Sequence, residues 1–153
     1  MQCKQAKAIA LRLLARREHA VAELRAKLIL RKLPNQLIDQ VIQAMLDADY
    51  LSDQRYAEAL IRVRSGKGYG LHYIQSILDG FNIDRQIQET AFSQVSVDWV
   101  KVAKDYCKKK PPKNKTKLAC KAHLYKRGFD DTSITQYIKS DFFASDAIDV
   151  YDD

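Results

Sequence analysis

The sequence has little of several residue types that mark particular protein classes. It contains three cysteines, Cys3, Cys107 and Cys120, an odd number without C-x-x-C spacing. This pattern argues against a disulfide framework and a zinc site, and it fits a reducing cytoplasm. The N-terminal stretch "MQCKQAKAIALRLLARRE" mixes cations with apolar residues and has no cleavage site, unlike a signal peptide. No apolar run approaches membrane-spanning length, so we expect no membrane contact.

Groups that would carry catalysis are also missing. His19, His72 and His123 stand alone, with no carboxylate or cysteine at metal-ligand spacing, and are predicted to be structural or surface histidines. No nucleophile stands beside a base as covalent catalysis requires, and the paired Asp130 and Asp131 sit at a turn. The sequence therefore predicts a protein that is not an enzyme and holds neither a metal nor another cofactor.

Glycine is scarce, with five residues, and three of them stand in "SGKGYGLHYIQSIL", which begins at Ser65. A phosphate-binding loop needs G-x-x-x-x-G-K-[ST] after a strand. Here the lysine lies inside the glycine run, and the preceding "SDQRYAEALIRVRS" has helical spacing of its apolar residues. We therefore expect Gly66 and Gly68 to break one helix and Gly70 to open the next.

Positive charge is in excess, with a net charge of +7 and a pI near 9.3, which favours an anionic partner. The charge alternates along the chain. Basic residues dominate three blocks, 1–33, 61–78 and 101–128, and each is followed by an acidic block, 34–60, 79–100 and 129–153. This order indicates a threefold repeat in which each unit is basic first and acidic afterwards.

Apolar positions repeat in the same register. "LILRKL", "LDGFNI" and "LYKRGF" align on Leu28, Leu78 and Leu124. In each copy the predicted left-handed helix cap lies four residues after the aligned leucine, and an apolar anchor follows the cap directly. The caps are Lys32, Asn82 and Gly128; the anchors are Leu33, Ile83 and Phe129; the next apolar positions are Ile38, Ile87 and Ile134; and the predicted helix starts are Ala20, Gly70 and Thr116.

We predict an all-α fold of three tandem three-helix repeats that form an extended, curved array with a concave face. The predicted repeats span residues 1–50, 51–96 and 97–143, and an acidic tail follows at 144–153. Because the stacked units cover one another's apolar faces, we predict a monomer. The tail is either a frayed end or a shield for the lysine-rich segment before it.

Several motifs together resemble the RecX family, which restrains the RecA recombinase. They are "LLARREHAVAELRAKL", "DYLSDQRYA", "KGYGLHYIQSIL", "DW" and "YKRGF", and the resemblance runs from about Ala8 to Ile138. It implies an all-helical, modular protein that binds the groove of the RecA filament on single-stranded DNA. It also implies limits on ATP hydrolysis, strand exchange and coprotease activity, in the cytoplasm and within DNA repair and the SOS response.

The sequence departs from the family pattern in the first two repeats. Ala20 replaces a frequent Ser, so we expect the capping box with Glu23 to be lost. Leu71 replaces the Pro that follows K-G-Y-G. Tyr73 and Gln75 stand where Arg is frequent, which lowers the expected anion contacts of the second repeat.

Candidate partner-binding residues come from three places. Lys67 and Tyr69 lie in the glycine run, where they either contact a partner, or Tyr69 packs over the helix junction and Lys67 is solvated. Lys101, Lys104 and Lys108 share one predicted stripe of a helix. The run "KVAKDYCKKKPPKNKTKLACK" is the strongest basic feature. Around the short connector at Pro111 and Pro112 its lysines are Lys108, Lys109, Lys110, Lys113, Lys115 and Lys117.

A second basic cluster lies near the N-terminus, and its candidate binding residues are Arg17 and Arg25. Its i, i+4 pattern is also that of any amphipathic helix. Trp99 is interpreted as core. Two functions stay open: a regulator that binds RecA filaments, and a stand-alone nucleic-acid-binding module that contacts single-stranded DNA directly.

Overall fold

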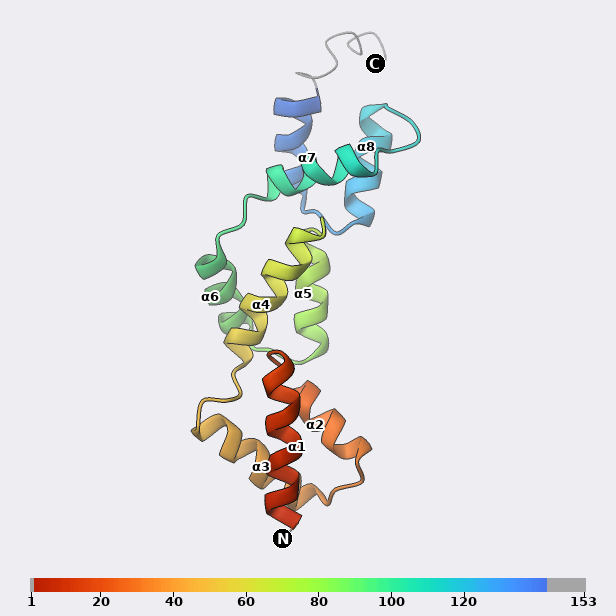
Figure 1. Ribbon diagram of the computed structural model, residues 1–153. Helices are drawn as coiled ribbons and strands as arrows, with labels where there is room; N and C mark the ends of the chain where they lie inside the picture. The colour runs from red at the N-terminus through yellow and green to blue at the C-terminus, as the bar shows by residue number, and fades with distance from the viewer. Residues whose placement is uncertain (1, 143–153) are drawn as a thin grey trace. The chain divides into compact units, whose positions relative to one another are not determined.

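A computed structural model describes residues 2–142, with side chains to 140, and all regular secondary structure in this part of the chain is helical, without a strand (Figure 1). The predicted all-α fold is confirmed over this range, whereas the predicted acidic tail lies outside the described residues. The helices are α1 Gln2–Arg16, α2 Val21–Leu30, α3 Asn35–Asp47, α4 Asp53–Gly66, α5 Leu71–Gly80, α6 Arg85–Val95, α7 Trp99–Lys109, α8 Lys117–Lys126 and α9 Asp131–Tyr137, followed by a π-helical turn, Ile138–Phe142.

The aligned helix ends have the conformation that the repeat pattern predicts. Lys32, Asn82 and Gly128 have φ values of 60°, 55° and 96°, which is the left-handed region that closes a helix. The aligned leucines before them, Leu28, Leu78 and Leu124, are completely buried. Lys32 adopts this conformation although lysine gains no local advantage from it, so the fold and not the residue type sets the cap there.

One aligned position was wrongly assigned from the sequence. The residue that follows the cap of α5 at the spacing of Ile38 and Ile134 is Gln88, which is 1% exposed, while the predicted Ile87 is only half-buried. Gln88 Nε2 donates to Asp79 Oδ1 at 2.8 Å and to the Ile83 carbonyl at 2.9 Å. A buried amide that closes the α5–α6 turn thus replaces the apolar residue of the other two copies.

The described helices group into two compact units, and the first contains residues 1–59 and 78–94. Here α1 packs on α2 and α3. The buried side chains of this core come from three helices and the loop after α3: Ala6, Ala10, Leu24, Leu28, Ile38, Val41, Ile42, Met45 and Leu51. The division into three repeats with the boundaries given above stays a prediction.

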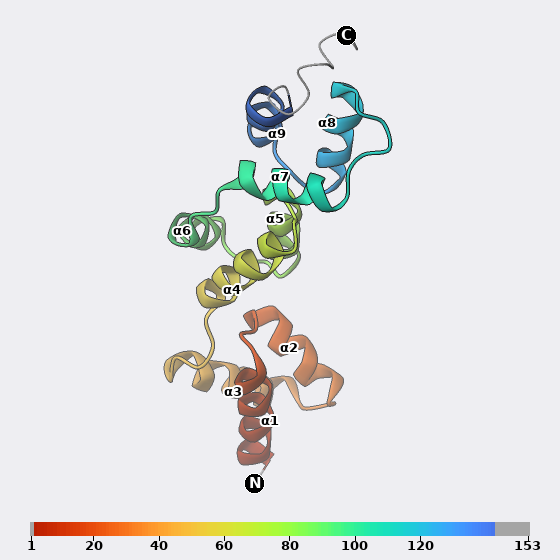
Figure 2. The same ribbon diagram turned by 45° about the horizontal axis from the view of Figure 1, so that its top comes forward.

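The second unit contains residues 60–77 and the chain from Val95 onward. In it α9 packs on α7 and α8, and an irregular connector at residues 110–116 joins α7 to α8 (Figure 2). Cys107 and Cys120 lie in its core as free thiols, and the interaction with Cys107 together with burial raises the pKa of Cys120. Trp99, interpreted as core, is half-buried.

The "DYLSDQRYA" motif of the first unit builds the start of α4. Asp53 Oδ1 accepts the Val21 backbone N–H at 2.8 Å, so it caps the free end of α2 from another helix. Arg55 pairs with Glu18 at 2.8 Å and with Asp49 at 2.9 Å, and it also donates to the Asp49 carbonyl. The polar residues of this motif therefore hold the unit together.

"REHAVAEL" is likewise structural, and one expectation about it needs correction. Ala20 has no side-chain acceptor, but its N–H still donates to Glu23 Oε1 at 3.3 Å, so half of the capping box remains. Burial alone would raise the pKa of Glu23, but its bonds with Arg17 lower it below the usual range. Glu23 thereby fixes both the start of α2 and Arg17.

His19 is 1% exposed and lies between two partners of this unit. Its Nδ1 is 3.0 Å from the Arg17 carbonyl, and its Nε2 is 2.9 Å from Lys27 Nζ. A carbonyl accepts and an ammonium donates, so the ring must carry its proton on Nδ1 and stay neutral. Burial lowers the pKa of His19 in agreement with this geometry.

The stability of the protein is expected to decrease as the pH falls from about 7.5 to about 5.5. Below the ordinary histidine pKa of 6.5 the unfolded chain takes up a proton at His19 that the folded chain does not. The unfolded state then binds more protons, so acid favours unfolding. Urea midpoints at several pH values should show this slope, and His19→Gln should reduce it. An equal slope in the wild type and in His19→Gln would contradict the assignment.

Candidate partner-binding surface

The glycine run of the second unit forms the turn between α4 and α5. α4 ends at Gly66, and Gly68 has a φ of 87°, as expected for a helix breaker. Gly70 lies against the turn after α8: its N–H donates to the Arg127 carbonyl at 3.2 Å, and the His72 N–H donates to the Gly128 carbonyl at 2.7 Å. The run is a docking turn for the end of α8, and its amides are not arranged around an anion.

Arg127 holds this junction through a stack of planar side chains. Its guanidinium carbon lies 3.6 Å from the Tyr69 ring centroid and 4.5 Å from that of Tyr106. Tyr69 stacks on Tyr73 at 4.0 Å, and Tyr106 stacks on His123 at 5.2 Å. The guanidinium also donates to the carbonyls of Lys67 and Gly68, so it contacts two aromatic rings and two backbone carbonyls at once.

Tyr69 therefore has one ring face against Arg127 and the other against Tyr73. A nucleic-acid base stacks on an aromatic side chain through an open ring face. Tyr69 could offer such a face only if one of these neighbours moved. Its packing supports the junction, and its role in partner binding stays a prediction.

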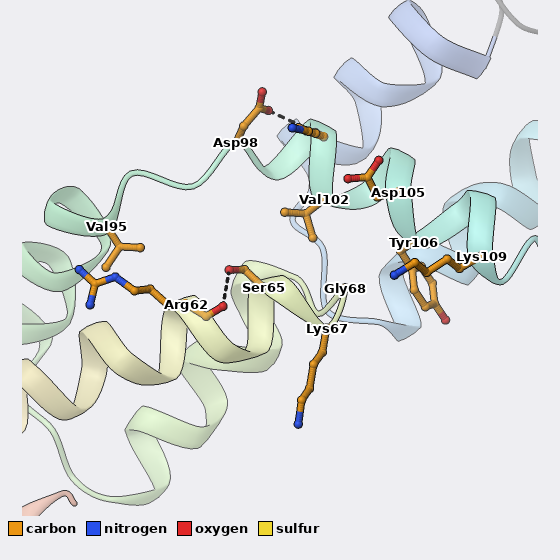
Figure 3. A pocket seen from close by; sticks show the side chains of 12 residues that line it. Arg62, Ser65, Lys67, Gly68, Val95, Asp98, Val102, Asp105, Tyr106 and Lys109 are labelled. Carbon is orange, nitrogen blue, oxygen red and sulfur yellow. Dashed lines mark hydrogen bonds between the residues drawn. The ribbon is translucent and has the colours of Figure 1, made fainter. Parts of the chain in front are cut away.

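A cleft of about 450 Å³ opens beside this junction, between the end of α4 and one face of α7 (Figure 3). Cationic side chains from both segments line it, together with two carboxylates and the apolar Val95 and Val102. The charged residues are Arg62, Lys67, Lys101 and Lys109, against Asp98 and Asp105. Figure 3 shows that the Lys67 side chain extends away from α7, whereas Arg62 extends toward Val95.

The two carboxylates of the cleft do not balance its cations. Asp98 caps α7, since its side chain accepts the Lys101 backbone N–H at 3.2 Å. Lys108 and Lys109 lie in the last turn of α7, where cations complement the helix dipole. Four cations against two carboxylates, one of which caps a helix, leave the cleft basic.

The connector after α7 extends this basic surface. Lys108, Lys109, Lys110, Lys113 and Lys115 are exposed, and none of them forms an ion pair within residues 2–140. Pro111 and Pro112 prevent the helix from continuing, and the Lys110 carbonyl lies 2.7 Å from His123 Nε2. One end of the connector is thus fixed on α8, while the lysines point to solvent.

The structure gathers only part of the predicted set. Lys67, Lys101 and Lys109 line one cleft. The cleft-lining face of α7 carries Lys101 and Lys109, so the predicted stripe of Lys101, Lys104 and Lys108 does not describe it; Lys104 and Lys117 are half-buried.

Arg17 and Arg25 lie in the first unit and are paired there. Arg17 bonds both carboxylate oxygens of Glu23, and Arg25 bonds Asp39 at 2.5 Å. A partner would have to compete with these internal carboxylates. Their role in binding stays a prediction, with less support than that of the exposed connector lysines.

Sequence reasoning missed Arg127, Tyr106, Arg62 and the two cleft carboxylates. The signal for Arg127 is its place directly before the left-handed Gly128, in "YKRGF". In the described residues no group of three or more histidine, cysteine or acidic side chains could hold a metal. No helix of residues 2–142 is long and apolar enough to cross a membrane.

The fold and this surface define a class of protein: an all-helical protein that presents a basic cleft beside an exposed lysine-rich connector. Comparison with known proteins makes the class specific. Residues 6–44 match the family model described as RecX, first three-helix domain. Regulatory protein RecX of Serratia proteamaculans (strain 568) is 32% identical in an alignment 160 residues long, which covers 87% of this chain and 95% of the relative.

Further relatives agree. Regulatory protein RecX of Vibrio vulnificus (strain CMCP6) is 36% identical over 72% of this chain and 70% of its own. A crystal structure of RecX from Lactobacillus salivarius has a TM-score of 0.71 at 22% identity, covering 90% of this chain and 94% of that one. A second crystal structure, of a regulatory protein RecX, has a TM-score of 0.76 at 17% identity, with 91% and 74% covered. The chain belongs to the RecX family, and its role is that of a RecX regulatory protein.

Proposed function

We propose that this protein binds RecA and its filament on single-stranded DNA and inhibits the ATPase, recombinase and coprotease activities of RecA without chemistry of its own. The observation that carries the proposal is the basic surface of the second unit: a cleft with four cations, continued by four further exposed lysines, Lys108, Lys110, Lys113 and Lys115. The resemblance to the RecX family implies RecA as the regulated recombinase, and the surface supplies a means of contact.

Electrostatic complementarity supports an anionic partner. Lysines without internal ion pairs keep their charge available, and such charges mainly raise the association rate and select the partner. Their position in the last turn of α7 and on the irregular connector that follows it is typical of binding residues. We therefore assign the first contact with the filament to residues 108–115.

A protein surface fits this pattern better than a uniform phosphate track. Acidic blocks separate the basic ones along the chain. The cleft itself also mixes four cations with Asp98 and Asp105. A phosphate track would repel these carboxylates, whereas a protein groove can pair with both signs.

Inhibition of RecA ATP hydrolysis on single-stranded DNA is the expected result when this protein is titrated into the reaction. A protein lodged in the filament groove obstructs more than the protomer that it touches, so inhibition should be complete well below equimolar protein. A steady-state ATPase assay at fixed RecA and DNA measures this. Unchanged hydrolysis at equimolar protein would refute the proposed function.

The stand-alone nucleic-acid alternative differs in its dependence on salt, and the exposed connector lysines are the observation in its favour. If they contact phosphates, affinity for bare single-stranded DNA should fall with a log–log slope of about −0.7 per contact. We expect modest binding to bare DNA and much tighter binding to the filament. Tight binding to bare DNA with no gain on the filament would favour the alternative.

A further inference from the structure

A second hollow in the second unit lies between α8 and α9, away from the residues that line the basic cleft. Leu118, Lys121, Ala122 and Tyr125 of α8 line it, with Ile134 of α9 opposite, and it measures about 440 Å³. α8 and α9 pack on each other. We call this hollow the α8 groove.

The α8 groove exposes more apolar surface than its place on a helix pair requires. Leu118 is 78% exposed and Tyr125 is 69% exposed, although both are large and lie on the same face of α8. Exposed apolar side chains that cluster around a hollow mark a binding site more often than scattered ones do. Lys121 within the groove and the exposed Lys126 beside it add positive charge.

The carboxylates near the groove leave this charge largely in place. Asp130 caps α9 through bonds to the Ser133 N–H and hydroxyl. Asp131 also lines the groove, from the first turn of the same helix, so the lining itself carries one carboxylate beside Lys121, and the exposed Lys126, next to Tyr125 in the sequence, supplies the excess of positive charge. The groove thus suits a ligand that is apolar and acidic together.

The chain itself carries a segment with this composition. Residues 143–153, "FASDAIDVYDD", combine Phe, Ile, Val and Tyr with four aspartates and no lysine or arginine. The segment begins immediately after the turn Ile138–Phe142, which continues α9, one wall of the groove. Eleven extended residues reach about 36 Å, more than twice the length of about 15 Å that ten-residue α8 has. The segment is therefore long enough to extend along the whole of α8.

We propose that residues 143–153 bind the α8 groove, with their apolar side chains against Leu118 and Tyr125 and their aspartates beside Lys121. The segment is a resident ligand of the second unit. It lowers the positive potential at the end of the lysine-rich connector, so an anionic partner meets a weaker field while the segment is bound. The proposed contact stands independently of the RecA proposal, and its test contains no partner.

Amide NMR of the full-length protein tests the contact. In the Leu118→Ser variant the heteronuclear NOE of residues 146–151 should fall, and amide shifts should change both there and along Lys117–Lys126. Ile148→Ser should change the same amides of α8 from the other side of the contact. Leu118 is exposed, so its variant should fold normally. The matched control is Leu30→Ser, since Leu30 is 81% exposed on α2 and should have no effect on residues 146–151.

Two outcomes would overturn the proposal. If the NOE values of residues 146–151 are identical in the wild type and in Leu118→Ser, the segment does not bind the groove. If the α8 shifts vary with protein concentration and are insensitive to Ile148→Ser, a second copy of the chain occupies the groove instead. Shifts that respond to both variants at all concentrations, and that diminish with added salt, are the expected result.

Discussion

Replacing Gly70 with alanine is expected to lower the free energy of unfolding by about 3 kcal/mol, the upper end of the usual cost of overpacking. A Cβ at Gly70 would lie 2.4 Å from the Gly128 carbonyl carbon and 2.4 Å from the Phe129 nitrogen. Both are backbone atoms of the turn after α8, so no side chain can rotate away. The turn must move, and the bonds from Gly70 and His72 to it must lengthen.

Gly80→Ala is the matched control, because Gly80 lies at the other end of α5 and its Cβ would meet nothing within 4 Å. Alanine should be neutral or stabilise the helix there by up to about 1 kcal/mol. Thermal unfolding followed by circular dichroism compares the two. A loss of about 3 kcal/mol should lower Tm by roughly 6–12 °C in a chain of this size. Equal melting of the two alanine variants would contradict the close approach.

Gly128→Val tests the same junction from its other side. Gly128 has a φ of 96°, and a Cβ there would lie 2.5 Å from Tyr73 Cβ and 2.7 Å from the Tyr73 nitrogen. Valine would therefore add backbone strain of about 1–3 kcal/mol to the steric cost. We expect this variant to melt below Gly70→Ala. A Gly128→Val variant that melts with the wild type would contradict both the left-handed cap and the junction.

The glycine run illustrates which part of the fold the sequence could predict. Helix breaks at Gly66 and Gly68 follow from local conformation, and they were predicted correctly. The role of Gly70 did not follow, because it depends on a turn more than 50 residues further along the chain. Local rules predicted that a glycine opens α5, but only tertiary contact explains why a side chain is excluded there.

Buried polar residues mark a second limit of sequence reasoning. Apolar periodicity placed Ile87 in the column of Ile38 and Ile134, but the buried residue at that spacing is Gln88. Its Nε2 is satisfied because Asp79 and the Ile83 carbonyl accept from it, whereas its Oε1 is buried without a hydrogen-bond partner among the described residues. A periodic pattern of apolar residues cannot predict a buried polar side chain, because the partners of that side chain lie in the preceding helix and turn.

The candidate site was predictable in composition but not in geometry. The exposed lysines of the connector follow from the charge run and the two prolines, and Lys67 was selected by its place in the glycine run. The cleft also depends on how α7 is oriented about its own axis, because this orientation puts Lys101 and Lys109 on the face that lines the cleft with Lys67. The sequence did not indicate Arg127, because this residue acts by packing against the rings of Tyr69 and Tyr106, and those contacts depend on the tertiary structure.

Charge reversal at two lysines, Lys109→Glu with Lys113→Glu, is expected to weaken inhibition of the RecA ATPase by about a hundredfold. Each reversal replaces an attraction with a repulsion, at a cost of roughly 1.4 kcal/mol or tenfold in affinity, and separate sites add. Lys109 lines the cleft and Lys113 lies on the connector, so the pair samples both parts of the basic surface. ATPase titrations of wild type and variant give the ratio.

The fold should survive this change, since both side chains are exposed and only Lys109, at the end of α7, loses a dipole contribution of about 0.3–1 kcal/mol. Lys4→Glu with Lys7→Glu is the control, because these exposed lysines of α1 give the same change in net charge. If both double variants lose inhibition equally, net charge rather than this surface governs binding. If neither does, residues 108–115 are not the contact. Loss confined to the Lys109 and Lys113 variant, with bare-DNA affinity little changed, would place a protein groove and not phosphate opposite the connector.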